Sequence, residues 1–188
     1  MTDFSIKPTL KGERATLVPM APEHFPALWK AMNDPEVTRY TGSRGETTEE
    51  VARHWTSTRG DTTDRLDLAI VDNATGECVG EAVLNEWEPE DRRCNFRIMI
   101  GPDGQGRGLG TDATRLIVGY GFETLGLHRI SLGVYAFNPR ARRAYEKAGF
   151  VREGVERDEL LWDGQWVDNI IMSILEDEWR RHRGHPEG

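Results

Sequence analysis

The segment Gln105-Gly106-Arg107-Gly108-Leu109-Gly110 decides the fold prediction. It joins a short stretch with the alternating pattern of a strand to a long stretch with the pattern of an amphipathic helix. Residues 96–100 alternate apolar side chains between two faces and predict a central strand. Residues 111–124 carry apolar side chains at helical spacing. The N–H groups at a helix N-terminus lack intrahelical partners, and glycines let an anion approach them closely. The strand, the glycine loop and the helix together predict an anion site, with a pyrophosphate as its natural occupant.

Two common phosphate loops do not fit this segment. A loop for metal-bound nucleoside triphosphates needs a lysine after its last glycine, and Gly110 is followed by threonine. The dinucleotide pattern Gly-x-Gly-x-x-Gly/Ala fails from both Gly104 and Gly106, and no acidic residue that could bind a ribose occurs in 124–145. A nicotinamide-dependent reductase is therefore only a weaker alternative.

Composition limits the partners of the chain. A length of 188 residues favours a single domain, 1–188. The 24 basic and 32 acidic residues give a net charge of −8, which repels nucleic acid and favours a cationic substrate. The only two cysteines, Cys78 and Cys94, form no Cys-x-x-Cys pair, so we expect no disulfide framework and no cysteine-rich metal site. This use of cysteine favours a reducing cytoplasm. No apolar run is long enough for a membrane span, and residues 1–10 do not look like a signal peptide. The oligomeric state stays open, with a homodimer as one option.

Periodicity places the other elements around the glycine loop. Thr47 and Glu50 resemble a capping box at the start of a helix, and Asp163-Gly164 favours a tight primed turn. The expected strands are 15–19, 65–71, 78–84, 129–135, 157–162 and 166–174, the expected helices include 22–33 and 139–148, and 180–188 is expected to fray. This order predicts a mixed α/β sheet with helices inserted between strands.

Two ordered signatures resemble those of the Gcn5-related N-acetyltransferases (GNAT). Gln105, Gly108 and Gly110 match the acetyl-coenzyme A loop of that family, Gln/Arg-x-x-Gly-x-Gly/Ala. Residues 138–150, an asparagine followed by a short helix with a tyrosine and ending in Gly-Phe, are similar to its second signature. The resemblance covers about 79–174 and is closest to the branch of ribosomal-protein N-terminal and spermidine acetyltransferases. It implies an α/β (α+β) single domain whose twisted, mostly antiparallel sheet of about seven strands is splayed at the acetyl-CoA site.

The resemblance also assigns the groups that hold acetyl-CoA. Main-chain groups of Ile98, Met99 and Ile100 would bind the pantetheine arm, and those of Gln105, Gly106, Arg107, Gly108, Leu109, Gly110 and Thr111 the pyrophosphate. Asn138 would bind the same arm, cap the helix that follows it, or do both. Arg140, Arg143 and Lys147 share one helical face, which is either a phosphate-binding patch, to which Arg107 could add, or a solvated surface.

Acetyl transfer from a thioester to an amine needs proton acceptors and donors. Tyr145 stands where the family's tyrosine protonates the departing thiolate, although a tyrosine packed on the apolar side of its helix would look the same. Direct transfer needs no cysteine nucleophile.

The base is less clear from the sequence. Many relatives carry a carboxylate on the strand before the coenzyme loop, whereas this strand carries Asn95, Arg97 and Met99. Glu86 is the nearest candidate and Glu81 the second, and each could instead be a charged hairpin end.

The acceptor pocket is expected between the first helices and the closing hairpin. Its candidate aromatic residues are Trp29, Tyr40, Trp55, Trp87, Trp162 and Trp166, which could equally be core. A small-molecule or peptide amine, such as a protein N-terminus, is the first expectation for the substrate. A polyamine or an aminoglycoside is the alternative, and a non-catalytic acyl-CoA sensor is the alternative from another class.

Overall fold

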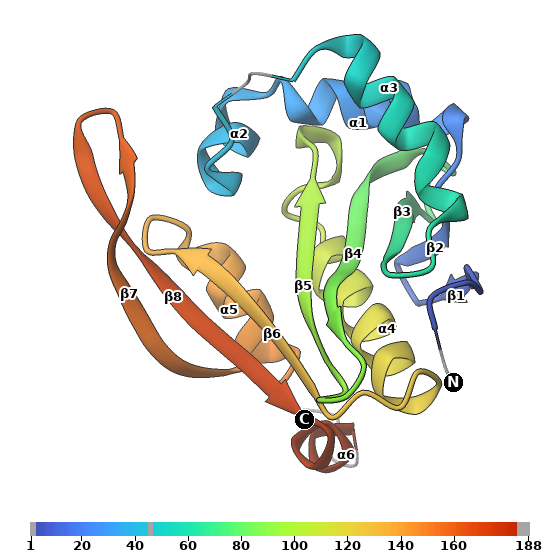
Figure 1. The fold of residues 1–188 in the computed structure, drawn as a ribbon. Helices are drawn as coiled ribbons and strands as arrows, with labels where there is room; N and C mark the ends of the chain where they lie inside the picture. The colour runs from blue at the N-terminus through green and yellow to red at the C-terminus, as the bar shows by residue number, and fades with distance from the viewer. Residues whose placement is uncertain (1–2, 45–46, 184–188) are drawn as a thin grey trace.

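One sheet of eight strands runs through the protein in the order β1-β2-β3-β4-β5-β6-β8-β7 (Figure 1). The computed structural model describes residues 3–44 and 47–183. The strands are β1 (Leu10–Lys11), β2 (Ala15–Pro19), β3 (Leu66–Asp72), β4 (Cys78–Glu88), β5 (Arg93–Ile100), β6 (Arg129–Tyr135), β7 (Val151–Trp162) and β8 (Gln165–Leu175). The helices are η1 (Pro22–His24), α1 (Phe25–Met32), α2 (Pro35–Thr41), α3 (Glu49–Thr58), η2 (Arg59–Asp61), η3 (Pro102–Gly104), α4 (Leu109–Glu123), α5 (Pro139–Lys147) and α6 (Glu176–Arg183).

The sheet opens between β5 and β6. All other neighbouring strands are antiparallel, but these two are parallel and pair over only three positions, Arg93–Asn95 against Arg129–Ser131. Beyond Asn95 the two strands diverge, as Figure 1 shows, so the edge of β5 that faces β6 is unpaired. The expectation of a splayed, mostly antiparallel sheet is confirmed, with eight strands in place of about seven because of the two-residue β1.

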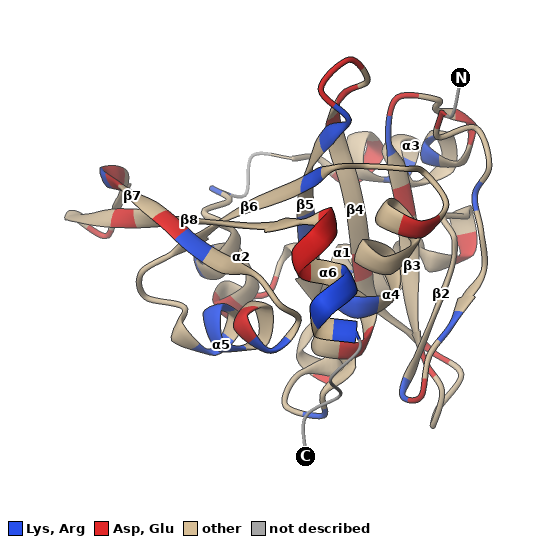
Figure 2. Cartoon of the chain, turned by 90° about the horizontal axis from the view of Figure 1, so that it is seen from below, with Lys and Arg blue, Asp and Glu red and all other residues tan. Residues whose placement is uncertain are grey.

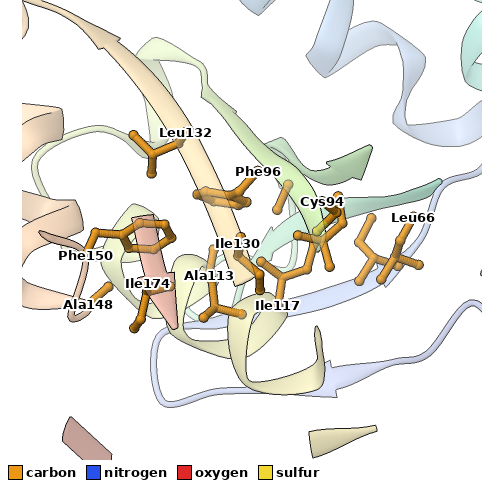
Figure 3. Close-up of a cluster of buried hydrophobic side chains, with 14 of the residues drawn as sticks. Leu66, Cys94, Phe96, Ala113, Ile117, Ile130, Leu132, Ala148, Phe150 and Ile174 are labelled. Atoms are coloured by element: carbon orange, nitrogen blue, oxygen red, sulfur yellow. The ribbon is translucent and has the colours of Figure 1, made fainter. Parts of the chain in front are cut away.

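Alternation along the strands separates two apolar layers. Phe96, Ile117 and Ile130 belong to the larger cluster, in which α4 packs against one face of the sheet (Figure 3). Leu28 of α1 packs with Ala69 on the opposite face. Successive side chains of β4 and β5 therefore point alternately toward α4 and toward α1, which decides which residues can face the open end of the sheet.

The N-terminal helices differ in detail from the sequence prediction. Helix α2 was not expected, and it begins with the Asp34 carboxylate accepting hydrogen bonds from the first-turn amides and ends at Gly42 with φ of 67°. The cap of α3 is Thr48, whose hydroxyl accepts from Val51 N at 3.3 Å, so the capping box predicted from Thr47 was one residue too early. The expected helix 22–33 is a 3-10 turn followed by α1.

The C-terminal segment is helical where fraying was expected. Helix α6 has an acidic first turn and a basic last turn, which complements the helix dipole (Figure 2). Trp179 is buried against α4, Arg180 pairs with Glu176 at 2.6 Å, and Arg183 pairs with Glu123. The predicted frayed tail is therefore wrong for 180–183, and the rest of that prediction, 184–188, lies outside the described residues.

Candidate active site

A cleft of about 1030 Å³ lies where β5 and β6 diverge. One end is lined by the glycine loop, the start of α4 and helix α5, and the other end by β3, β4, β5 and helices α1, α2 and α3. The cleft is continuous, so a ligand held at the loop can present its far end to a second molecule below α1 and α3. Within the described residues, no group of three or more His, Cys, Asp or Glu is placed to hold a metal ion.

The glycine loop presents uncapped helix amides to the cleft. Gly106 and Gly108 adopt φ of 75° and 78°, a region that favours glycine, and Gly108 is the N-cap of α4 without any side-chain cap. The carboxylate of Asp112 accepts from the backbone N of Arg14 and Ala15 at 2.8 and 2.9 Å, which fixes the start of α4 against β2. The first amides of α4 are thus positioned and available to an anion.

Replacing Gly106 by alanine is expected to weaken acetyl-CoA binding about tenfold, because a methyl group would obstruct the approach of phosphate oxygens to the loop amides. The protein itself leaves open space there, since a Cβ at Gly106 would meet no atom within 4 Å. Gly164→Ala is the matched control, with φ of 76° and equally open space in the β7–β8 turn. Both variants should lose about 1–2 kcal/mol of stability from the left-handed backbone. Equal acetyl-CoA affinity in the two variants, measured by isothermal titration, would contradict the role of the loop.

The side chain of Arg107 does not join the expected phosphate patch. Its guanidinium donates to Asp72 Oδ2 at 2.7 Å and to the carbonyl of Asp103 at 2.6 Å, so only its main chain belongs to the loop. The hydrogen bond from Ala74 N, together with that from Arg107, lowers the pKa of Asp72. The sequence could not show this pairing, because Asp72 ends a strand on the other side of the loop.

Helix α5 does bring its cations to the cleft. Arg140, Arg143 and Lys147 all line it, as their spacing predicted. Arg140 donates to Gln105 Oε1 at 2.8 Å, and Gln105 Nε2 donates to the carbonyl of Ile100 at 3.2 Å, so the loop, α5 and β5 are connected. Arg143 makes no ion pair within residues 3–44 and 47–183, which leaves its charge available to a phosphate.

Asn138 caps α5 and lies at the cleft, so the structure is compatible with both roles that the sequence left open, and binding of the coenzyme arm stays a prediction. Its Oδ1 accepts from Ala141 N at 3.1 Å and caps α5, while the residue also lines the cleft. Its amide nitrogen makes no hydrogen bond to the described part of the chain and can donate to a ligand. Ile98, Met99 and Ile100 line the same cleft along the unpaired edge of β5, where an extended chain could add like a strand.

Tyr145 lies in the wall of the cleft between the apolar layer and open space. Its ring contacts Phe96 and Phe150 at centroid distances of 6.2 and 6.0 Å. Its hydroxyl has no hydrogen-bond partner among the residues described, and burial raises its pKa above the ordinary tyrosine value. The phenol therefore stays protonated and is a donor without an internal acceptor.

The two candidate bases lie in different environments. Glu81 is half-buried in the cleft, between Ala69 of β3 and Met99 of β5 in the sheet register, and no described group hydrogen-bonds to it. Burial raises its pKa, assisted by the charge of Asp67 and opposed by nearby arginines. Glu86 also lines the cleft, but it is exposed at the irregular end of β4 with φ of 52°. Glu81 thus has the environment expected of a base.

Half of the candidate aromatic residues line the cleft. Trp29, Tyr40 and Trp55 do so, whereas Trp87 packs edge-on against Phe4 in the core. Trp162 and Trp166, in the β7–β8 hairpin, are not among the lining residues. The sequence did not predict a charged cluster in the same part of the cleft. There Arg65 donates two 2.7 Å hydrogen bonds to Asp67, and Arg97 also lines the cleft.

Comparison with known proteins agrees with this geometry. The profile of the family described as acetyltransferase (GNAT) domain matches residues 14–151. Spermidine N(1)-acetyltransferase of Escherichia coli K12 is 35% identical over 116 residues, and the match covers 62% of this chain and 62% of that protein. An uncharacterized N-acetyltransferase, p20 of Bacillus licheniformis, is 28% identical over 91% of this chain and 98% of its own length. The spermidine N-acetyltransferase of Vibrio cholerae, solved in complex with CoA and spermine, shares the fold with a TM-score of 0.81 at 24% identity, covering 89% of this chain and 98% of its own.

Proposed function

The chain belongs to the acetyltransferase (GNAT) domain family, and from that premise we propose that it transfers an acetyl group from acetyl-CoA directly to a primary amine. The observation that carries the proposal is the single cleft in which an anion-binding loop, a protonated tyrosine and a half-buried glutamate all take part. A non-catalytic acyl-CoA sensor would need the loop 105–110 and Asn138 but not Tyr145.

The residues at the loop end of the cleft fit acetyl-CoA. The amides of 105–111 would hold the pyrophosphate, Arg143 and Lys147 would add positive charge, and Asn138 with the free edge of β5 would hold the pantetheine arm. Acetyl-CoA supplies an acetyl group activated as a thioester.

Glu81 and Tyr145 supply the proton chemistry. The amine must lose a proton as it forms the amide bond, and Glu81 accepts that proton directly or through one water. As the nitrogen–carbon bond forms, the carbon–sulfur bond breaks and the hydroxyl of Tyr145 gives its proton to the sulfur, which leaves as a thiol. Water then returns a proton to Tyr145 and takes the one held by Glu81. Burial raises the pKa of Tyr145, but it disfavours the thiolate as well, so the phenol remains an effective donor.

A cysteine nucleophile is not part of the proposal. Burial raises the pKa of Cys94 to about 12 and also raises the pKa of Cys78, so both thiols stay protonated near neutral pH. The two cysteines are free, which supports a reducing cytoplasm as the site of action that we propose.

A protein N-terminus or a small amine is the acceptor that we propose first. A polyamine is the second candidate, because the similar proteins include spermidine acetyltransferases, one of which was solved with spermine.

The test is an amine screen with acetyl-CoA in which free thiol is monitored and products are identified by mass. We expect thiol release that depends on the amine, with one acetyl group added per thiol. Thiol release without an acetylated product would show hydrolysis only. Tight acetyl-CoA binding without turnover of any amine would support the sensor, and tight NADH binding would support the reductase.

A further inference from the structure

Arg97 is a cation in the acceptor end of the cleft whose guanidinium has no hydrogen-bond or ion-pair partner among the described residues. It lies on β5, is exposed, and lines the cleft. Its guanidinium makes no hydrogen bond or ion pair within residues 3–44 and 47–183, although its charge acts on Glu81 and lowers the pKa of that carboxyl. In the register of the sheet it stands opposite Val83 of β4, which in turn stands opposite Asp67 of β3. A long charged side chain that lines a ligand cleft and donates no hydrogen bond to the described residues has its donors available to a ligand.

The neighbouring arginines are already engaged. Arg65 forms a two-pronged pair with Asp67 whose side chains are 20% and 3% exposed. The guanidinium of Arg59 lies 5.9 Å from the centroid of the Trp55 ring. Asp67 therefore has its charge balanced by Arg65, and Arg97 is not needed to neutralise it.

Arg97 also lies on the wrong face of the sheet to serve the cofactor phosphates. Phe96 and Ile98 on either side of it belong to or pack on the layer with α4, so Arg97 points to the side covered by α1 and α3. The phosphate-binding groups of the glycine loop and α5 stand at the other end of the cleft. The partner of Arg97 is thus to be sought on the acceptor.

The charge of this end of the cleft does not suit a polycation. Among the described residues its charged lining residues are Arg59, Arg65 and Arg97 against Asp67, Glu81 and Glu86, so the two signs are equal in number there. This balance contrasts with the net charge of −8 for the whole chain. A polyamine would be bound best by a clear excess of carboxylates, whereas a molecule with one amine and one carboxylate matches a balanced site.

Glu81 and Arg97 are placed to receive the two ends of such a molecule. Glu81 pairs with Met99, two residues from Arg97 on β5, so the two are diagonal neighbours on one face of the sheet. Diagonal neighbours are about 7–8 Å apart, within reach of one small molecule or of one peptide end.

We propose that Arg97 binds a carboxylate of the acceptor, so that the preferred acceptor is a primary amine with an acidic group close to it. This inference rests on the proposed acetyl transfer. The acidic group can belong to a free amino acid or to the first residue of a peptide. A planar guanidinium can hold either carboxylate through two parallel hydrogen bonds.

The test compares acceptors that differ only in charge. The first arm is aspartate against its diamide, the second is an amidated tripeptide that begins with Asp against one that begins with Asn, and the third is spermidine. In the wild type we expect the acidic member of at least one pair to have the higher kcat/KM. The pair that shows this preference identifies whether the carboxylate belongs to a free amino acid or to the first residue of a peptide. Arg97→Gln should raise KM for that acceptor about 10- to 100-fold, with little change for its uncharged counterpart and for acetyl-CoA. Arg97→Lys should restore part of the affinity.

Arg93→Gln is the matched control, because Arg93 is on the same strand and face, is exposed, and is absent from the cleft lining. It should leave all acceptors unchanged, and melting temperatures would verify that both glutamine variants fold. Because Arg97 also lowers the pKa of Glu81, Arg97→Gln can lower kcat for every acceptor, and the deciding quantity is KM. Preference for the uncharged amines or for spermidine in the wild type, or an equal rise of KM for all acceptors in Arg97→Gln, would overturn the role of Arg97 alone. Absence of turnover in every arm would overturn both this role and the proposed acetyl transfer.

Discussion

Replacing Glu81 by glutamine is expected to lower kcat for acetyl transfer about 10²- to 10⁴-fold, with KM for acetyl-CoA close to the wild-type value. Glutamine keeps the size and the packing of the side chain between Ala69 and Met99, but it cannot accept the proton of the amine. The wild-type rate should rise with pH as Glu81 ionises, since only the carboxylate is a base. The variant should lack this rise, and steady-state kinetics over a pH series would measure it.

Glu86→Gln is the matched control for this prediction. Glu86 lines the same cleft on the same strand, but it is exposed at the end of β4. The control should retain most of the activity. If the loss appeared in Glu86→Gln and not in Glu81→Gln, the base would be Glu86, the first expectation from the sequence.

Stability should change in the opposite direction to activity. Burial, and next the charge of Asp67, raises the pKa of Glu81 above its ordinary value of 4.5, while Arg97, Arg65 and Arg59 lower it. The folded chain therefore holds this proton more tightly than the unfolded chain, and ionisation of Glu81 destabilises the fold as the pH rises above about 4.5. Glu81→Gln removes that penalty. Its melting temperature should exceed the wild-type value increasingly from pH 4.5 upward and then level off.

The cofactor end of the site was predictable because its determinants are local. The residues 105–110 form the loop, and the same short stretch contains the glycines that allow the turn and the start of the helix that supplies the amides. Asn138 caps the helix that carries Tyr145, and the sequence marks this helix by Pro139 and by the Gly-Phe pair after it. In each case the residues concerned are near neighbours in sequence, so the motifs could predict that they line one cleft, as they do.

The acceptor end depends on contacts that spacing does not contain. Glu81 and Glu86 are on one strand, but the register of β4 with β5 shifts after Asn85, where Glu86 has a positive φ. The alternation of side chains along the strand could therefore not predict which glutamate is the more buried. Arg107 belongs to the loop by sequence, yet its side chain binds Asp72, which is 35 positions away. That the Arg97 guanidinium has no hydrogen-bond or ion-pair partner in the described part of the chain could likewise be seen only once β3, β4 and β5 were aligned.

Replacing Tyr145 by phenylalanine is expected to lower kcat about 100-fold or more and to leave KM for acetyl-CoA nearly unchanged. Phenylalanine preserves the ring contacts with Phe96 and Phe150, so the wall of the cleft should keep its shape. What is lost is the hydroxyl, which has no acceptor among the described residues and is kept protonated because burial raises its pKa. The measurement is thiol release at saturating amine, with acetyl-CoA affinity determined separately by isothermal titration.

Tyr120→Phe provides the comparison that separates chemistry from packing. Tyr120 lies on α4, packs on the same apolar cluster, and also has a pKa raised by burial, but it does not line the cleft. Loss of either hydroxyl should have a similar small effect on the melting temperature, whereas only Tyr145→Phe should slow turnover. If Tyr145→Phe turned over at the wild-type rate, the departing sulfur would take its proton from water, and Tyr145 would be a packing residue of the cleft wall. If both variants slowed equally, the effect would come from the shared apolar layer and not from a proton donated to the thiolate.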